Sequence, residues 1–195
     1  KSVDEYLNHT KNFNLQSDDE KLKNPVLYVH NMEIEKVPNN EISISFSLLL
    51  NLSSVCHAED PEIIWGFIEK YSPGSRIEKN KFLEQMVNLS VVYYNDMIKP
   101  KKVYRAPNVK EEKALKELVF SLKNADEHST PEEIQKIIFS IGKDNQYENL
   151  RDWFRSLYEI LLGQSEGPRM GSFIHLFGIP ETISLINNAL GGKLK

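Results

Sequence analysis

The chain has 195 residues, a hydrophobic fraction of 40% and a formal net charge of -4 at pH 7. This length and composition support one sizeable core or two small ones, and the negative charge excludes a global field that attracts nucleic acid, so such binding needs a local basic patch. The single cysteine, Cys56, excludes an internal disulfide and indicates a reducing, cytoplasmic setting.

The beginning of the chain predicts a connecting arm. The first residue is Lys1 rather than Met, in the middle of the helical pattern SVDEYL, which predicts a piece of a longer protein. We expect residues 1–40 to form a connecting arm of less regular structure. Within it, residues 24–40 carry two prolines, and an extended arm and a short strand both remain open there.

Helix starts recur along the chain as capping boxes or as a capping residue before proline. They occur at Ser2/Glu5, Ser17/Glu20, Asp60-Pro61, Asn108/Glu111 and Thr130/Glu133. Apolar residues spaced by three and four follow over residues 63–71, 82–97, 115–122 and 134–141. Because no alternating runs are joined by a hairpin dipeptide, the sequence predicts an all-α fold, with a first helical subdomain at 41–107 and a second at 108–195.

Helix ends are marked by glycine and proline. Ser72-Pro73-Gly74 closes one apolar stripe, and Gly191-Gly192 closes the last helix. Gly142 and Gly163 are expected to take the left-handed conformation that ends helices. The longest apolar stretch, residues 44–55, is broken by Ser and Asn and is shorter than the roughly 20 residues of a membrane span. The sequence therefore predicts no membrane association.

Motifs that mark known reaction centres are missing from the sequence. It has no GxxxxGK[ST] or GxGxxG phosphate loop, no HExxH, no CxxC and no GxSxG elbow. The five histidines are scattered and lack a metal-ligand spacing. We therefore expect no catalytic residue, no metal site and no cofactor within this chain.

The first basic segment is the stretch between Lys99 and Pro107. Lys99, Lys101, Lys102 and Arg105 supply four cations without an acid, held between prolines after a long helix. A loop of this kind can bind phosphates without desolvating its charges. A solvated linker, whose lysines favour the C-terminus of the preceding helix through its dipole, is the alternative.

The second basic segment, Leu150–Gly178, mixes arginines with aromatic residues. Trp153 and Leu157 share a helix face and are expected in the core. Arg151 and Arg155 share the outer face, although Asp152 can pair with Arg155 at a spacing of three.

The same segment continues into a glycine turn around Arg169. Glycines at 167 and 171 allow close backbone approach, and a helix beginning after Gly171 would present free amides as an anion site. We therefore include Arg169 and Ser172 among the candidate RNA-binding residues.

Three strings of the sequence together resemble a known family. They are HAEDPEIIWGFIEKYSPG, YYNDMIKPKKVYRAP and LRDWFRSLYEILLGQSEGPRMGSFIHLFGIPETISLI. In this order they resemble the carboxy-terminal half of class I lysyl-tRNA synthetases, which are built on a Rossmann catalytic core. GQSEGPRMGSF is the most specific piece, and SVDEYL resembles the segment that follows the second signature loop of the catalytic domain.

The resemblance implies an α-helix cage that receives the anticodon stem-loop of tRNA-Lys. The full-length enzyme would activate lysine with ATP and charge the tRNA. The HIGH-type and KMSKS-type ATP-binding signatures are absent from this sequence, so we expect the chain alone to be inactive. Individual base-reading residues and the oligomeric state are not specified by the resemblance.

Two other functions compete with this prediction. One is a helical protein-interaction scaffold in which the aromatic residues only form the core. The other is the equivalent anticodon domain of a glutamyl-type synthetase, against which the GPRMGSF turn argues. A scaffold predicts that removing Arg169 has little effect on RNA binding.

Overall fold

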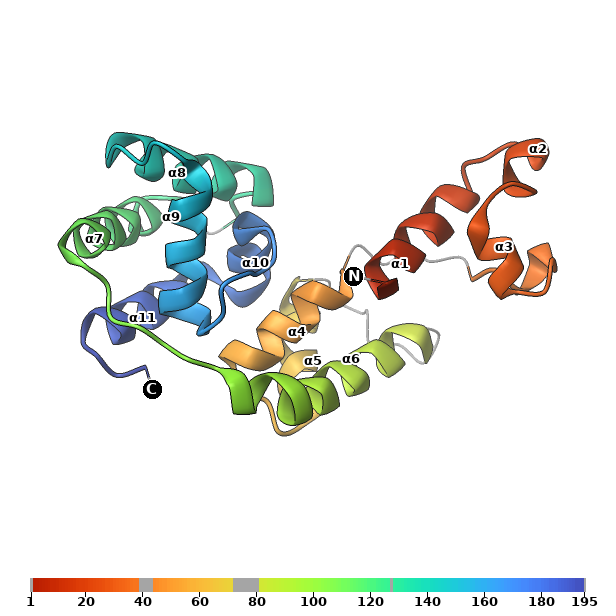
Figure 1. The fold of residues 1–195 in the computed structure, drawn as a ribbon, viewed down its shortest axis with the longest axis horizontal. Coiled ribbons are helices and arrows are strands. Elements are labelled where there is room, and N and C mark those ends of the chain that lie inside the picture. Colours follow the sequence, from red (N-terminus) through yellow and green to blue (C-terminus); the bar gives the residue numbers. More distant parts are fainter. Residues whose placement is uncertain (1, 39–43, 72–80, 127, 195) are drawn as a thin grey trace. The chain divides into compact units, whose positions relative to one another are not determined.

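A computed structural model describes residues 2–38, 44–71, 81–126 and 128–194 of the chain. Within these residues every regular element is a helix, which confirms the all-α prediction. The chain divides into two compact units, Lys1–Ser47 and Leu48–Lys195 (Figure 1). Among the described helices, none combines the length and the apolar character that a membrane crossing requires.

The first unit consists of short helices around a small core. Its elements are α1 (Ser2–Phe13), α2 (Asp18–Lys21), α3 (Pro25–Val29) and the 3-10 turn η1 (Ile34–Lys36). Phe13, Val26, Leu27 and Val37 are buried together, and Tyr6 packs against them. Residues 24–38, where a strand had remained open, thus form short helical turns instead.

Side-chain caps explain where the helices of the first unit begin. The Asn24 side chain accepts a hydrogen bond from the Val26 amide (3.0 Å) and donates one to the His9 carbonyl (3.1 Å). Glu20 accepts a hydrogen bond from the Ser17 amide (2.9 Å), which forms part of the predicted capping box. Ser2 already belongs to α1, so the first predicted cap lies inside the helix.

The second unit contains the remaining helices. They are α4 (Phe46–Val55), which starts in the first unit, α5 (Pro61–Tyr71), α6 (Lys81–Tyr93) with its π-helical extension η2 (Tyr94–Ile98), the 3-10 turn η3 (Lys99–Lys101), α7 (Val109–Lys123), α8 (Pro131–Asp144), α9 (Leu150–Leu157) with its π-helical extension η4 (Tyr158–Leu162), α10 (Met170–Phe177) and α11 (Ile179–Leu190). The predicted boundary at 107/108 falls inside this unit, in the extended segment before α7; the three-part division stays a prediction.

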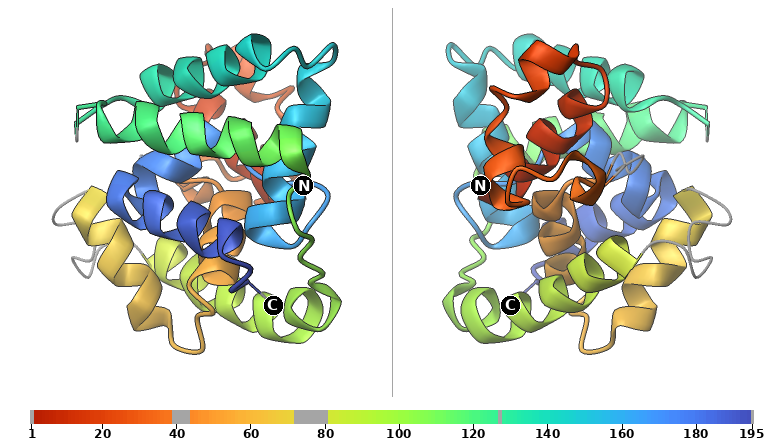
Figure 2. Two further views of the ribbon diagram at one scale, coloured as in Figure 1. Left: turned by 90° about the vertical axis from the view of Figure 1, so that its left-hand side faces the viewer. Right: turned by 90° about the vertical axis from the view of Figure 1, so that its right-hand side faces the viewer.

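Helix α10 is the central packing element of the second unit. It packs against α8, α11 and α5. Phe177 stacks on Phe67 of α5 and on Phe173 of its own helix, with ring centroids 5.5 and 5.4 Å apart. Figure 2 shows α7 and α8 side by side, and α9 packs against α8. The residues of α10 are mostly buried as a result.

Most of the predicted helix boundaries hold. Asn108/Glu111 and Thr130/Glu133 form complete capping boxes at the starts of α7 and α8. Gly163 has φ = 68° and ends η4, as predicted. Gly192 also has a positive φ, of 67°, whereas Gly191 does not. The Ser72-Pro73-Gly74 stop lies outside the described residues.

The prediction for Gly142 is wrong. This residue lies inside α8, two residues before its end. A Cβ atom there would meet Cδ1 of Trp153 at 2.7 Å and Cδ2 of Leu150 at 2.8 Å. Gly142 is thus explained by the close packing of the Trp153 indole against α8 rather than by a helix end.

Candidate nucleic-acid interface

The basic segment 99–107 is a linker, and most of its cations bind other parts of the same chain. The ammonium group of Lys99 pairs with Glu59 (3.1 Å). Lys102 donates to the Ser54 carbonyl (2.8 Å) and lies 4.8 Å from the ring centroid of Tyr104. Burial lowers the pKa of Lys102 to about 8. These two lysines therefore have partners within the second unit.

Arg105 is the most extensively paired cation of the linker. Its guanidinium group forms a fork with both carboxylate oxygens of Glu111 (2.8 Å each) and donates from Nε to Glu159 (2.6 Å). Glu111 is buried and also accepts from the Ser156 hydroxyl (2.6 Å). Burial by itself would raise the pKa of Glu111, but hydrogen bonds from Arg105, Ser156 and Asn108 outweigh it and lower the pKa to about 2.

A groove lies where the linker meets the turn after η4. The Val103 amide donates to the Gly163 carbonyl (3.1 Å), which joins two segments that are far apart in the sequence. The groove has a volume of about 670 Å³ and is lined by Lys101, Val103, Arg105, Glu159, Gly163, Gln164, Ser165 and Glu166. Of the four predicted linker cations, Lys101 is the one for which the described residues show no ion pair, hydrogen bond or ring contact. The groove itself has mixed charge.

The arginines of α9 point away from the core. Trp153 and Leu157 are fully buried, which confirms their predicted place in the core. Arg151 and Arg155 are exposed on the opposite side and form no ion pair among the described residues, so the alternative pairing with Asp152 is not realised. Both guanidinium groups are therefore available to a partner.

An aromatic pair lies beside these arginines. The ring of Phe154 meets that of Phe139 on α8 edge to face, with centroids 5.2 Å apart. Phe139 is 39% exposed although it is a large apolar residue. Lys136 and Lys143, three residues before and four after Phe139, share its side of α8 and have no ion pair in the described part of the chain. None of these three residues was predicted from the sequence as part of a binding site.

Contacts connect Arg169 to the same surface. Arg169 pairs with Glu132 (2.9 Å), which lies two helical turns before Phe139 on α8. The Tyr158 hydroxyl, one turn after Phe154, donates to the Pro168 carbonyl (2.8 Å) next to Arg169. The residues of what we call the α8–α9 surface are Lys136, Phe139, Lys143, Arg151, Phe154, Arg155 and Arg169. It brings together three predicted arginines and places an aromatic pair among them.

Exposed acids also occur near this surface. Asp144 and Asp152 follow Lys143 and Arg151 in the sequence, but consecutive residues of a helix are rotated by about 100° from each other. Neither acid pairs with a cation of the surface within the described residues. The α8–α9 surface thus carries unpaired positive charge on a chain whose net charge is negative.

The predicted anion site at the start of α10 is wrong in one respect. The Gly171 amide is not free, because it donates to Oε1 of Gln135 (2.7 Å) inside the protein. A Cβ atom at this position would also collide with the Pro131 carbonyl and approach Gln135. The glycine therefore permits α10 to pack on α8. Ser172 is half-buried in the first turn of α10.

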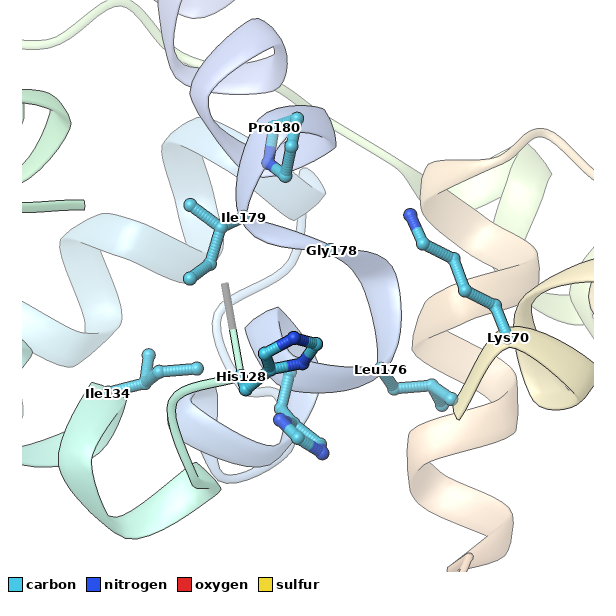
Figure 3. A pocket seen from close by; sticks show the side chains of 8 residues that line it. Lys70, His128, Ile134, Leu176, Gly178, Ile179 and Pro180 are labelled. Atoms are coloured by element: carbon cyan, nitrogen blue, oxygen red, sulfur yellow. The ribbon is translucent and has the colours of Figure 1, made fainter. Parts of the chain in front are cut away.

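A separate pocket of about 370 Å³ lies near the junction of α10 and α11 (Figure 3). Its walls are Lys70, His128, Ile134, His175, Leu176, Gly178, Ile179 and Pro180. The ammonium group of Lys70 pairs with Glu181 (3.1 Å), and Nδ1 of His175 lies 3.0 Å from the Ser129 carbonyl. None of the predicted RNA-binding residues lines this pocket.

Comparison with known proteins identifies relatives along the whole chain. It is 42% identical to the lysine–tRNA ligase of Rickettsia bellii over 97% of this chain and 36% of that protein. It is 43% identical to the lysine–tRNA ligase of Roseobacter denitrificans over 100% of this chain and 36% of the relative. The lysine–tRNA ligase of Rickettsia akari is 42% identical, again over 100% and 36%.

No protein-family model matches the chain. The likeness to individual relatives is nevertheless continuous from one end of the chain to the other, and it covers about a third of each relative's length. The chain is therefore a homologue of lysine–tRNA ligases, an all-α protein that corresponds to 36% of their length.

Proposed function

We propose that this chain is the tRNA-binding part of a class I lysine–tRNA ligase and that its α8–α9 surface receives the anticodon stem-loop of tRNA-Lys. The observation that supports this most is the homology to lysine–tRNA ligases along 97% to 100% of the chain. The α8–α9 surface supplies the matching chemistry, since Lys136, Lys143, Arg151 and Arg155 have no ion pair among the described residues and lie around an aromatic pair of which Phe139 is exposed.

The chemistry of an RNA loop fits these side chains. Guanidinium groups bind phosphate oxygens through parallel donors, and the unpaired bases of a loop stack on aromatic rings. Phe139 and Phe154 offer ring surface, and Arg151 and Arg155 lie within one helical turn of Phe154. A duplex alone would leave the rings without a partner, so the surface favours the looped end of the RNA.

We also propose that lysine activation with ATP takes place in the part of the enzyme that this chain does not span. The supporting facts are the 36% coverage of the relatives and the missing ATP-binding signatures in this sequence. The chain alone is then expected not to charge tRNA-Lys in an aminoacylation assay with lysine and ATP. Charging by the chain alone would contradict this part of the proposal.

A binding titration tests the anticodon proposal. Transcribed tRNA-Lys is titrated with the chain, beside transcripts whose anticodon bases are changed. We expect the cognate transcript to bind more tightly. Equal affinity for every anticodon would exclude anticodon reading, and no RNA binding at low salt would refute the proposed function.

Variants of the α8–α9 surface locate the binding site. Phe139→Ala is expected to weaken binding roughly 5- to 150-fold, since one base–aromatic stack contributes about 1–3 kcal/mol. Phe120→Ala is the matched control, because Phe120 is an even more exposed phenylalanine on α7, outside the surface. Equal losses for both variants would argue against stacking at Phe139, and no loss for either would favour the scaffold.

The salt dependence tests the arginines. The slope of log affinity against log salt, measured between about 50 and 200 mM, should become shallower by about one for Arg151→Gln and again for Arg155→Gln. Lys116→Gln on α7, whose ammonium pairs with Glu112 (2.5 Å), should leave the slope unchanged. A slope that responds equally to all three changes would place the phosphate contacts elsewhere.

A further inference from the structure

The backbone around Arg169 is held firmly on both sides. The Tyr158 hydroxyl anchors the Pro168 carbonyl (2.8 Å), and the Gln135 side chain anchors the Gly171 amide (2.7 Å). Gly167 packs against the Tyr158 ring, where a Cβ atom would come within 2.7 Å of Cε1. The turn that carries Arg169 is therefore fixed by buried contacts that a larger residue at 167 or 171 would break.

The tip of the Arg169 side chain is held much less firmly. Among the described residues its one ion pair joins a terminal nitrogen to an oxygen of Glu132 (2.9 Å). The side chains of Arg169 and Glu132 are 53% and 59% exposed. Exposed pairs of this kind contribute little, because water and salt screen them. Arg105 differs, because its fork engages a buried carboxylate.

We propose that Arg169 forms a phosphate-binding site for RNA and that Glu132 occupies this site while no RNA is bound. The inference rests on the proposed function and names the group that the site takes. A carboxylate oxygen accepts from a guanidinium group as a phosphate oxygen does. The Glu132 carboxylate thus stands where the phosphate would bind, and an RNA phosphate replaces it.

The surroundings favour this replacement. Lys136 lies one helical turn after Glu132 on the same side of α8, so a phosphate at Arg169 would have a second cation within reach. Phe139 follows in the next turn, where a base attached to that phosphate could stack. Because the turn around Arg169 is anchored, the exchange needs only rotation of exposed side chains.

A double-mutant cycle on the full chain tests the inference, with transcribed tRNA-Lys as the probe and binding followed by fluorescence anisotropy. Glu132→Gln keeps the size of the side chain and should tighten binding about two- to fivefold, as expected for removal of an exposed competing pair. Arg169→Gln should weaken binding several-fold. The double variant should bind like Arg169→Gln, since the guanidinium group for which Glu132 competes with RNA is then absent.

A control separates this mechanism from general repulsion of the RNA. Asp152→Asn removes an exposed acid of α9 that has no ion pair among the described residues. The change in RNA affinity that Asp152→Asn causes should be the same in the unchanged chain and in the Arg169→Gln variant. If the gain from Glu132→Gln also persists in the Arg169→Gln background, Glu132 repels RNA only by its charge and the inference is overturned.

Failure of the inference is distinguishable from failure of the proposed function. If Arg155→Gln weakens binding but the cycle shows no coupling between Glu132 and Arg169, this inference alone fails. If Arg155→Gln, Phe139→Ala and Arg169→Gln all bind like the unchanged chain, the α8–α9 surface is not the RNA site and both proposals fall. Circular dichroism of each variant confirms that the helices are retained.

Discussion

Arg105 connects the linker to α7 and to η4. Its guanidinium group binds Glu111 at the start of α7 and Glu159 in η4, while Glu111 also closes the capping box with Asn108. One carboxylate thus serves a helix cap, an ion pair and a hydrogen bond from Ser156. Because the pair is partly buried and fully hydrogen-bonded, losing one member leaves the other uncompensated.

The Glu111 network makes stability depend on pH. The folded pKa of Glu111, about 2, lies below its ordinary value of 4.5, so its contribution is present above pH 4.5 and is lost as the pH falls through about 2. Glu111→Gln should lower the free energy of unfolding at neutral pH by about 2 kcal/mol, less than for a fully buried pair because Arg105 is 37% exposed. Urea denaturation between about pH 5 and pH 2 should show a weaker acid dependence for this variant.

The exposed neighbour Glu112 provides the control for this prediction. Glu112→Gln removes a carboxylate whose partner, Lys116, lies on the surface of the same helix. It should change the stability by less than about 0.5 kcal/mol. Equal pH profiles for the two variants would show that Glu111 does not cause the acid dependence.

In helix α9 the spacing of residues predicted which side is buried and which side is exposed, but it did not predict the whole site. The spacing of Trp153 and Leu157 predicted the buried side, and Arg151 and Arg155 followed as the exposed side. Phe139 could not be predicted in this way. Its place in the surface depends on its contact with Phe154, which forms only when α8 packs against α9. Nor could the sequence predict that Arg105 binds both Glu111 and Glu159, since Glu159 lies on η4, far along the chain. Arg151 binds no acid among the described residues.

Trp153 is the residue on which the α8–α9 packing most depends. Its indole is fully buried, donates to the Ile138 carbonyl (3.1 Å) and fills the space over Gly142. Trp153→Ala should lower the free energy of unfolding by about 3–5 kcal/mol, measured by thermal or urea denaturation. Phe154→Ala, on the half-buried side of the same helix, should cost clearly less, and the reverse order would contradict the packing.

The whole chain combines a negative net charge with a locally basic surface. Its charge of -4 does not direct it toward RNA, yet all residues of the α8–α9 surface lie in the unit Leu48–Lys195. The helical class could be derived from the sequence because capping boxes and apolar spacing are local properties. The grouping of residues 48–195 into one unit could not, because it depends on contacts such as Phe67 with Phe177.

This grouping predicts that a chain beginning at residue 44 folds by itself. It keeps α4 whole but loses Asp4, whose carboxylate accepts from the amides of Phe46 (2.6 Å) and Ser47 (3.2 Å), a cap contributing about 1 kcal/mol. We expect one cooperative unfolding transition and unchanged affinity for tRNA-Lys. Gradual unfolding, or weaker RNA binding with intact helices, would show that residues 1–43 contribute to the structure or the site.

The burial of both tryptophans has a spectroscopic consequence. Trp65 and Trp153 are 6% and 0% exposed, so the native chain should emit at short wavelength and shift to the red only when it unfolds. Ligands arriving at the outer side of α8 would leave this emission almost unchanged. The fluorescence of a tryptophan introduced by Phe139→Trp could therefore be followed while the emission of the two buried tryptophans stays constant. Quenching of the introduced tryptophan would report RNA binding at α8.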